Sequence, residues 1–398
     1  MNTNDESSQI QHKTGLSQME SIPIGKQLKP LKKYSDRGAL VEVNANSKRI
    51  NAIKKDNGRT NPTTQPMPRV RKDLDNLDRN TSKKRRIYND NDDIIISTNQ
   101  NNDVLQKDSP WFKLDEQDKN DPSMVYEYSD NIFEYFYKRE SELLPLRNYT
   151  VKTETKHTIR SSVRAILIDW LVEVHEKFQC FPETLYLAIN IMDRFLAANK
   201  VNTDKLQLLA VTSLFIAAKF EEIHLPKLAE YAYITDGAAT KEDIKTAELY
   251  MLTKLKFELA WPNPMNFLRR LSKADGYDTE TRNISKYILE FAFCCPNFIG
   301  EKPSYISAIA FFIARRITSK DKTWDNNFIH YSGGIDPVND IRFQSACKQL
   351  VNEIDTPRTR LPSLKMKYNE GDPKGIHDIV LRYCTMEVDH SFSTLFAL

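Results

Sequence analysis

Glycine, cysteine and long apolar runs are all scarce in this chain, and each scarcity excludes a class of protein. Its 398 residues include only 11 glycines, none arranged as the GxGxxG or GxxxxGK[ST] loops that hold phosphates. The five cysteines show neither CxxC nor Cys/His metal spacing. The most apolar run, Ile306–Ala314, has about nine residues, whereas a membrane-spanning helix needs about twenty. We expect no metal, no cofactor, no membrane partner and an intracellular protein with reduced cysteines.

Catalytic patterns are also missing. His175 and Glu176 are not followed by the second histidine that a zinc protease would need, and the other histidines are scattered. The net charge of +3, with 28% charged residues, is close to balance, so composition does not indicate a direct nucleic-acid partner. The sequence therefore predicts a binding protein rather than an enzyme.

The first 110 residues differ sharply from the remainder. Tyr34 and Tyr88 are their only aromatic residues, and Asn, Asp, Lys, Ser and Thr are abundant. Such a segment cannot bury enough apolar surface to offset the entropy of ordering, so residues 1–120 are predicted to be a disordered tail. An amphipathic N-terminal helix is expected to follow, because one helical stripe unites Val125, Tyr128, Ile132, Tyr135 and Phe136.

Beyond that helix the pattern predicts a helical bundle. In the segment Val163–His175, apolar residues occupy more than one helical face, which indicates either a buried helix or a docking surface. The segment Leu206–Phe220 is apolar nearly all round, as a central helix should be. Pro182 stands at a predicted first helical position, and Thr240 with Asp243 forms a capping-box pattern.

An internal repeat spans the break at Trp261–Pro264. Phe215-Ile-Ala-Ala-Lys219 matches Phe312-Ile-Ala-Arg-Arg316, 97 positions later. At the same offset Glu183-Thr184 matches Glu280-Thr281, and Ile191 matches Ile288. Two helical segments that agree at one offset predict a duplicated helical unit.

Several runs in a fixed order carry a family resemblance. They are Val163-Arg-Ala-Ile-Leu167, Asp169-Trp-Leu-Val172, Met192-Asp-Arg-Phe-Leu196, Lys219-Phe-Glu-Glu-Ile223 and Tyr233-Ile-Thr-Asp236. Together they resemble the cyclin box, and residues 122–398 resemble B-type cyclins, most of all the budding-yeast S-phase pair. The resemblance implies an all-α fold of tandem five-helix cyclin boxes. We place the N-terminal helix and first box at 121–262 and the second box at 263–398.

The resemblance also implies a kinase-binding surface. Lys219 and Glu248 match the pair that hydrogen-bonds the backbone of a cyclin-dependent kinase around its mobile helix. The apolar contacts beside them would be Phe220, Phe257, Tyr128, Ile132 and Tyr135. From the pattern alone, the two charges could equally be solvated at helix edges and the two phenylalanines could be core.

A second implied surface is the patch that docks Arg-x-Leu peptides of substrates and inhibitors. Its residues here are Val163, Ile166, Leu167, Trp170, Glu173 and Gln207. The apolar side chains would take the leucine, and the acidic side chain would take the arginine. Cyclins usually have Met where Val163 stands, and a core position for Trp170 is the alternative.

The tail carries two short motifs. Arg37, Leu40 and Val43 match the R-x-x-L-x-x-V pattern of a destruction box, which a ubiquitin ligase reads during mitosis. Two basic clusters have the spacing of a bipartite signal for a nuclear import receptor: Arg71 and Lys72, then Lys83, Lys84, Arg85 and Arg86. These motifs predict a nuclear protein with some cytoplasmic population.

Two alternatives remain within this interpretation. A mitotic rather than S-phase role would use the same fold and the same surfaces. A cyclin-fold transcription adaptor would bind DNA and a basal factor, but it calls for a net basic face and commonly a zinc ribbon, and the charge and cysteine spacing disfavour both.

Overall fold

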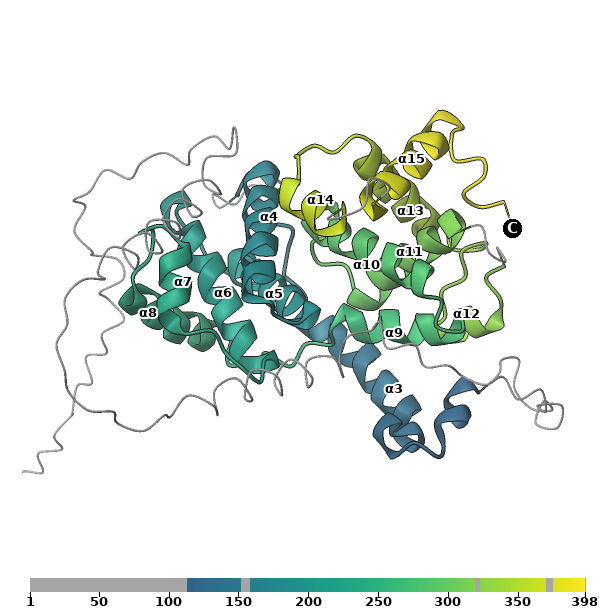
Figure 1. Cartoon of the computed structure of the whole chain (residues 1–398), viewed down its shortest axis with the longest axis horizontal. Coiled ribbons are helices and arrows are strands. Elements are labelled where there is room, and N and C mark those ends of the chain that lie inside the picture. Colours follow the sequence, from purple (N-terminus) through teal and green to yellow (C-terminus); the bar gives the residue numbers. More distant parts are fainter. Residues whose placement is uncertain (1–112, 152–157, 319–322, 370–374, 398) are drawn as a thin grey trace, which may run out of the picture. The chain divides into compact units, whose positions relative to one another are not determined.

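The computed structural model describes residues 113–151, 158–318, 323–369 and 375–397, and every regular element in these ranges is helical (Figure 1). The helices of the first half are α3 (Ser129–Arg139), α4 (Ser161–Phe178), α5 (Pro182–Ala198), α6 (Leu206–Glu221), α7 (Leu228–Ile234) and α8 (Lys241–Lys254). Those of the second half are α9 (Pro264–Ala274), α10 (Thr279–Cys294), α11 (Pro303–Thr318), α12 (Asn326–Tyr331), α13 (Ile341–Asp355), α14 (Pro362–Asn369) and α15 (Ile376–Asp389).

The duplicated unit predicted from the sequence is confirmed. Leu206 and Pro303, the first residues of α6 and α11, stand 97 positions apart, as do their last residues, Glu221 and Thr318. The helices α4–α8 form the first five-helix box, and α9–α13 repeat it. Two further helices, α14 and α15, follow the second box and were not predicted.

The central helix of each box is the most apolar one. In α6 the residues from Leu208 to Ala218 are all buried, and in α11 those from Ile306 to Arg316 are buried as well. The helix ends obey local chemistry: Pro182 opens α5, and Thr240 and Asp243 form the predicted capping box of α8. The hydroxyl of Thr240 accepts from the Asp243 amide at 3.1 Å.

The N-terminal helix is shorter than predicted, and its packed face shares only Phe136 with the predicted stripe. Val125 has a positive φ of 49°, a three-residue 3-10 turn covers Tyr126–Tyr128, and α3 begins at Ser129. Its packed face comprises Phe133, Phe136 and Tyr137, whose rings all lie within 6.2 Å of the Phe267 ring of α9. The predicted stripe could not distinguish these faces, because aromatic residues occur on both.

Residues just before α3 are held against the second box. A short 3-10 helix, Leu114–Asp118, supplies two carboxylates to Lys273 of α9, with Asp115 at 2.7 Å. A close approach also requires Gly333, since a Cβ there would lie 2.7 Å from the Tyr137 ring.

Buried polar groups join the two boxes. The Arg164 guanidinium of α4 pairs with Asp193 at 2.7 Å and donates to the carbonyl oxygens of Phe293 and Cys294 at the end of α10. The buried Asp169 carboxylate accepts from the Ser363 and Leu364 amides, both at 3.1 Å, at the start of α14. The first helix of box one therefore also organises the second box and α14.

Candidate kinase-binding and peptide-docking surfaces

Lys219 and Glu248 meet across two helices of the first box. Lys219 ends the buried run of α6, and its Nζ lies 2.6 Å from Glu248 Oε1 on α8. The same Nζ lies 4.4 Å from the centroid of the Phe215 ring. The Lys219 side chain is 45% exposed and that of Glu248 is 15% exposed, so the pair stands at the surface. Lys219 and Glu248 can give up this ion pair and form hydrogen bonds to the backbone of a partner instead.

The two phenylalanines predicted to flank this pair are not core residues. Phe220 is 51% exposed and Phe257 is 64% exposed. Phe257 stands in a turn after α8 in which both Lys256 and Phe257 have positive φ, a costly conformation for residues with a Cβ. The Phe257 amide donates to the Leu252 carbonyl at 2.9 Å, which stabilises the turn.

The apolar face of α3 predicted to contact a kinase is also exposed. Tyr128, Ile132 and Tyr135 show 57%, 37% and 55% of their surface. An ion pair between Arg139 of α3 and Glu258 links this helix to the Phe257 turn, and Arg194 of α5 donates to the Glu258 carbonyl at 2.7 Å. The sequence analysis missed this cluster, because its members are far apart in the chain and carry no motif.

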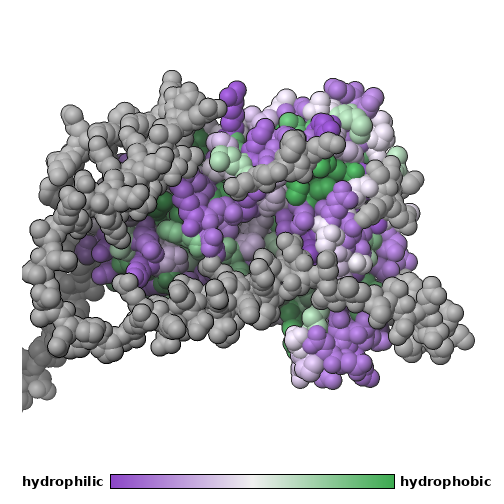
Figure 2. All heavy atoms as spheres, in the orientation of Figure 1, coloured by the Kyte–Doolittle hydropathy of each residue, from purple (hydrophilic) through white to green (hydrophobic). Residues whose placement is uncertain are grey.

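Further exposed apolar residues of the first box were also missed. Ile223, Tyr233 and Leu249 are 77%, 73% and 65% exposed. Leu249 directly follows Glu248 within the mostly apolar stretch Ala247–Leu252. That position was the one sequence feature that could have indicated that Leu249 belongs to the same surface as Glu248. On the face shown in Figure 2, hydrophilic residues make up most of the coloured surface and hydrophobic residues appear as smaller patches between them.

The docking patch lies on α4 and the start of α6, which pack together. Ile166 is 45% exposed, and Val163, Leu167, Trp170 and Gln207 are partly buried. The buried face of α4 instead includes Ile168, Leu171 and Val174. Trp170 is partly buried, so it packs against the core while part of its side chain stays accessible.

The acidic member of the patch already has a cation beside it. Glu173 Oε1 lies 2.6 Å from Lys177 Nζ, one helical turn further along α4. Because this pair is exposed on a helix, it contributes only about 0.3–0.5 kcal/mol. An arginine with two parallel N–H donors can replace such a lysine.

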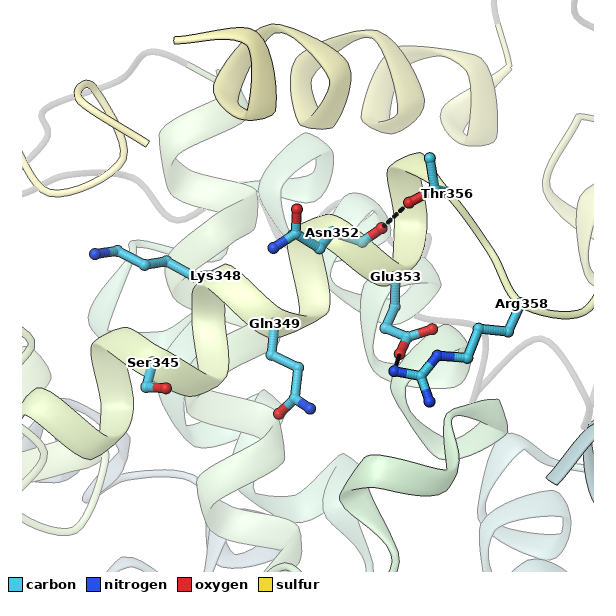
Figure 3. Close-up of a pocket in the computed structure, with 7 residues that line it drawn as sticks. All are labelled: Ser345, Lys348, Gln349, Asn352, Glu353, Thr356 and Arg358. Atoms are coloured by element: carbon cyan, nitrogen blue, oxygen red, sulfur yellow. Dashed lines mark hydrogen bonds and ion pairs between the residues drawn. The ribbon is translucent and has the colours of Figure 1, made fainter. Parts of the chain in front are cut away.

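A hollow on the second box offers no comparable arrangement. It lies along α13 and the turn that follows, where Glu353 and Arg358 pair at 3.0 Å and the Thr356 hydroxyl donates to the Asn352 carbonyl. Figure 3 marks both interactions. The lining of the hollow is polar, and Glu353 and Arg358 already pair with each other. None of the predicted site residues lies there.

Glu221, two residues after Lys219, is an unusual acid. Its burial, and then the carboxylates of Glu183 and Glu222, raise its pKa from 4.5 to about 7. Between these pH values the folded chain keeps a proton that the unfolded chain releases. Stability is therefore highest below pH 4.5 as far as this group is concerned, and it falls as the pH rises toward 7.

We expect Glu221→Gln to stabilise the protein at pH 8 by about 1–2 kcal/mol, because the amide removes the unfavourable charge. At pH 4.5 the substitution should change little. Melting temperatures across this pH range measure the effect, with the exposed Glu134→Gln as control. Parallel pH profiles for wild type and Glu221→Gln would contradict the assignment.

In the described ranges, no group of His, Cys, Asp and Glu side chains is arranged to hold a metal ion. None of the helices described is long and apolar enough to cross a membrane. The destruction-box residues Arg37, Leu40 and Val43, and the import clusters at residues 71–72 and 83–86, lie outside the described residues.

Comparisons with known proteins agree with this architecture. A family model for the N-terminal domain of cyclins matches residues 131–260, and one for the C-terminal domain of cyclins matches residues 262–380. S-phase entry cyclin-5 of Saccharomyces cerevisiae is 57% identical over 290 residues, which cover 72% of this chain and 67% of that protein. S-phase entry cyclin-6 of the same yeast is 44% identical over 350 residues, 88% of each chain. The G2/mitotic-specific cyclin CLB2 of Candida albicans is 50% identical over 227 residues, 57% of this chain and 46% of that protein.

The tandem helical boxes and these matches define a cyclin, and the chain belongs to the cyclin family. Within that family it is a B-type cyclin, similar to the S-phase entry cyclins of budding yeast. Cyclins are regulatory subunits of cyclin-dependent kinases, so this chain is a kinase regulator and not itself a catalyst.

Proposed function

We propose that the chain binds its kinase through the surface formed by Lys219, Phe220, Glu248 and Phe257, together with the exposed face of α3. The observation that carries this proposal is the surface ion pair of Lys219 and Glu248 with large exposed aromatic side chains beside it. Exposed aromatics around a charged pair are typical of an interface core rather than of free surface.

Activation would be a shift in the kinase's conformational equilibrium. The cyclin binds the active arrangement, with the mobile helix inward and the activation loop open, more tightly than the inactive one. Mg-ATP and the catalytic groups belong to the kinase. The two-point attachment at α3 and at the end of α6 is suited to hold one orientation of that mobile helix.

Co-purification tests this function. The full chain, mixed with a purified cyclin-dependent kinase subunit, should elute with it and confer phosphorylation of a histone-type substrate. Kinase without the chain should show little activity. A chain that neither co-elutes nor activates any cyclin-dependent kinase would refute the proposal.

We further propose that the complex promotes DNA replication in S phase, as the names of two similar budding-yeast proteins indicate for those proteins. The match to a G2/mitotic-specific cyclin keeps a mitotic role as the second candidate. Kinase activity measured in synchronised cells, early or late in the cycle, distinguishes the two.

For substrate choice we propose Arg-x-Leu docking at the α4 patch. We expect Leu167→Ala with Trp170→Ala to weaken phosphorylation of substrates that carry Arg-x-Leu by about tenfold or more, while short peptides without the motif are unaffected. Comparing kcat/KM for two substrates that differ only in this motif makes the measurement. Equal loss on both substrates would show that Trp170 serves the core instead.

The tail is proposed to serve import and destruction. Arg37→Ala with Leu40→Ala should make the protein persist through mitotic exit, since the ubiquitin ligase loses both anchors.

Changing Lys83, Lys84, Arg85 and Arg86 to Ala should shift the protein from nucleus to cytoplasm. One basic cluster binds the import receptor more weakly than two linked clusters do. Fluorescent fusions followed through one cell cycle report both effects. Wild-type turnover and location in these variants would contradict the assignments.

A further inference from the structure

The last residues of the described chain are held much as a bound peptide would be. After α15 the segment Ser391–Ala397, called here the C-terminal segment, runs back beside the second box (Figure 1). Within it Leu395 is completely buried, and the Phe396 ring stacks on Phe312 of α11 with centroids 5.6 Å apart and planes 17° apart. These two side chains anchor a segment that forms no helix of its own.

Arg316 of α11 binds the backbone of this segment. Its guanidinium donates to the Ala397 carbonyl at 2.6 Å and to the Thr394 carbonyl, so one buried cation satisfies two main-chain acceptors. Lys348 of α13 lies 5.7 Å from the centroid of the Phe396 ring on the other side. Arg316 therefore binds a turn of the chain, since the Ala397 amide also donates to the Thr394 carbonyl at 3.3 Å, and Phe396 anchors this turn on α11.

The internal repeat shows which residues of the first box correspond to Arg316 and Phe312. Arg316 stands 97 positions after Lys219, and Phe312 stands 97 positions after Phe215, at identical places in α11 and α6. In the first box the corresponding cation lies over its phenylalanine and stays at the surface, 45% exposed. In the second box the corresponding cation is buried beneath the C-terminal segment.

We propose that Phe312, Arg316 and Lys348 form a peptide-binding surface, the second-box counterpart of the Lys219 surface, and that the C-terminal segment occupies it as an internal ligand. Its ligand class is a short peptide that carries Leu-Phe and folds into turns, with main-chain carbonyls directed at the guanidinium. Because the chain's own C-terminal segment occupies the second-box surface, only the Lys219 surface of the first box stays open to a partner. The comparison between boxes rests on the proposed kinase contact, whereas the peptide site itself does not.

The test uses the full chain with Leu395→Ala and Phe396→Ala, which removes both anchors of the internal ligand. A fluorescent peptide of residues 389–398 is then added, and its anisotropy is measured. We expect the double variant to bind this peptide at least about tenfold more tightly than wild type, whose own segment competes at high effective concentration. Adding Arg316→Met to the double variant should abolish that binding, while adding Lys219→Met should leave it unchanged.

If the double variant folds poorly, its melting temperature with and without the peptide provides a second measurement. Recovery of the melting temperature when the peptide is added supports an internal ligand. Failure of the peptide either to bind or to restore the fold would overturn the proposal, because the segment would then be an inseparable part of the core. Kinase co-elution is measured on the same variants. The variant changed at Leu395 and Phe396 should still co-elute with the kinase. If Lys219→Met prevents co-elution, that result bears only on the proposed kinase contact and not on the peptide site.

Discussion

Replacing Lys219 and Glu248 together with Ala should weaken kinase binding by at least about thirtyfold while leaving the cyclin folded. Truncating hydrogen-bonded charges at a desolvated interface costs about 2–5 kcal/mol, and every 1.4 kcal/mol is about tenfold in affinity. In the free chain the two side chains satisfy each other at the surface, so their loss should lower stability by no more than about 1 kcal/mol.

A matched control exists in the second box. Arg342 and Glu301 form an exposed ion pair with the same 2.6 Å separation, away from every residue proposed to contact the kinase. Changing both to Ala should leave affinity for the kinase unaltered. Affinity from titration calorimetry and melting temperature from calorimetry make the comparison. Equal affinities for the Lys219/Glu248 variant and wild type would remove the pair from the interface.

The largest loss of stability is expected from Arg164→Met. The guanidinium is buried and serves Asp193, Tyr149 and two carbonyl groups of the second box. Its removal leaves the Asp193 carboxylate buried without a cation, which costs about 3–5 kcal/mol. The melting temperature should fall by about 10 °C in a domain pair of this size.

Two variants separate the charge effect from a simple packing effect. Arg160→Met removes an exposed arginine just before the same helix and should leave stability nearly unchanged. Arg164→Met combined with Asp193→Leu removes both charges and should recover much of the loss. Equal instability of the single and double variants would show that packing, and not the uncompensated carboxylate, dominates.

Periodicity predicted the helices and their duplication because those features are local. The all-round apolar pattern of Leu206–Phe220 identified a central helix, and the 97-residue offset predicted the second one. The same pattern could not decide whether Phe220 is buried, since it follows an all-round apolar run but stands between Lys219 and Glu221. Its exposure depends on where the adjacent helices end, which is a tertiary property.

Long-range polar contacts were beyond prediction for a related reason. Arg164 was noted only as part of a family motif, yet its partners Phe293 and Cys294 lie about 130 residues away. The same holds for Asp169, whose carboxylate caps α14, a helix that the two-box expectation did not include. Side chains that satisfy distant backbone groups leave no periodic signal in a sequence.

Hydrogen exchange of the full chain with and without its kinase tests the central claim most directly. The account predicts new protection in α3, in the residues around Lys219–Ile223 and in the stretch from α8 through the Phe257 turn. It predicts no new protection in α13 or in the C-terminal segment, which is already covered. Protection confined to the second box, or none in the first box, would contradict the proposed kinase-binding surface.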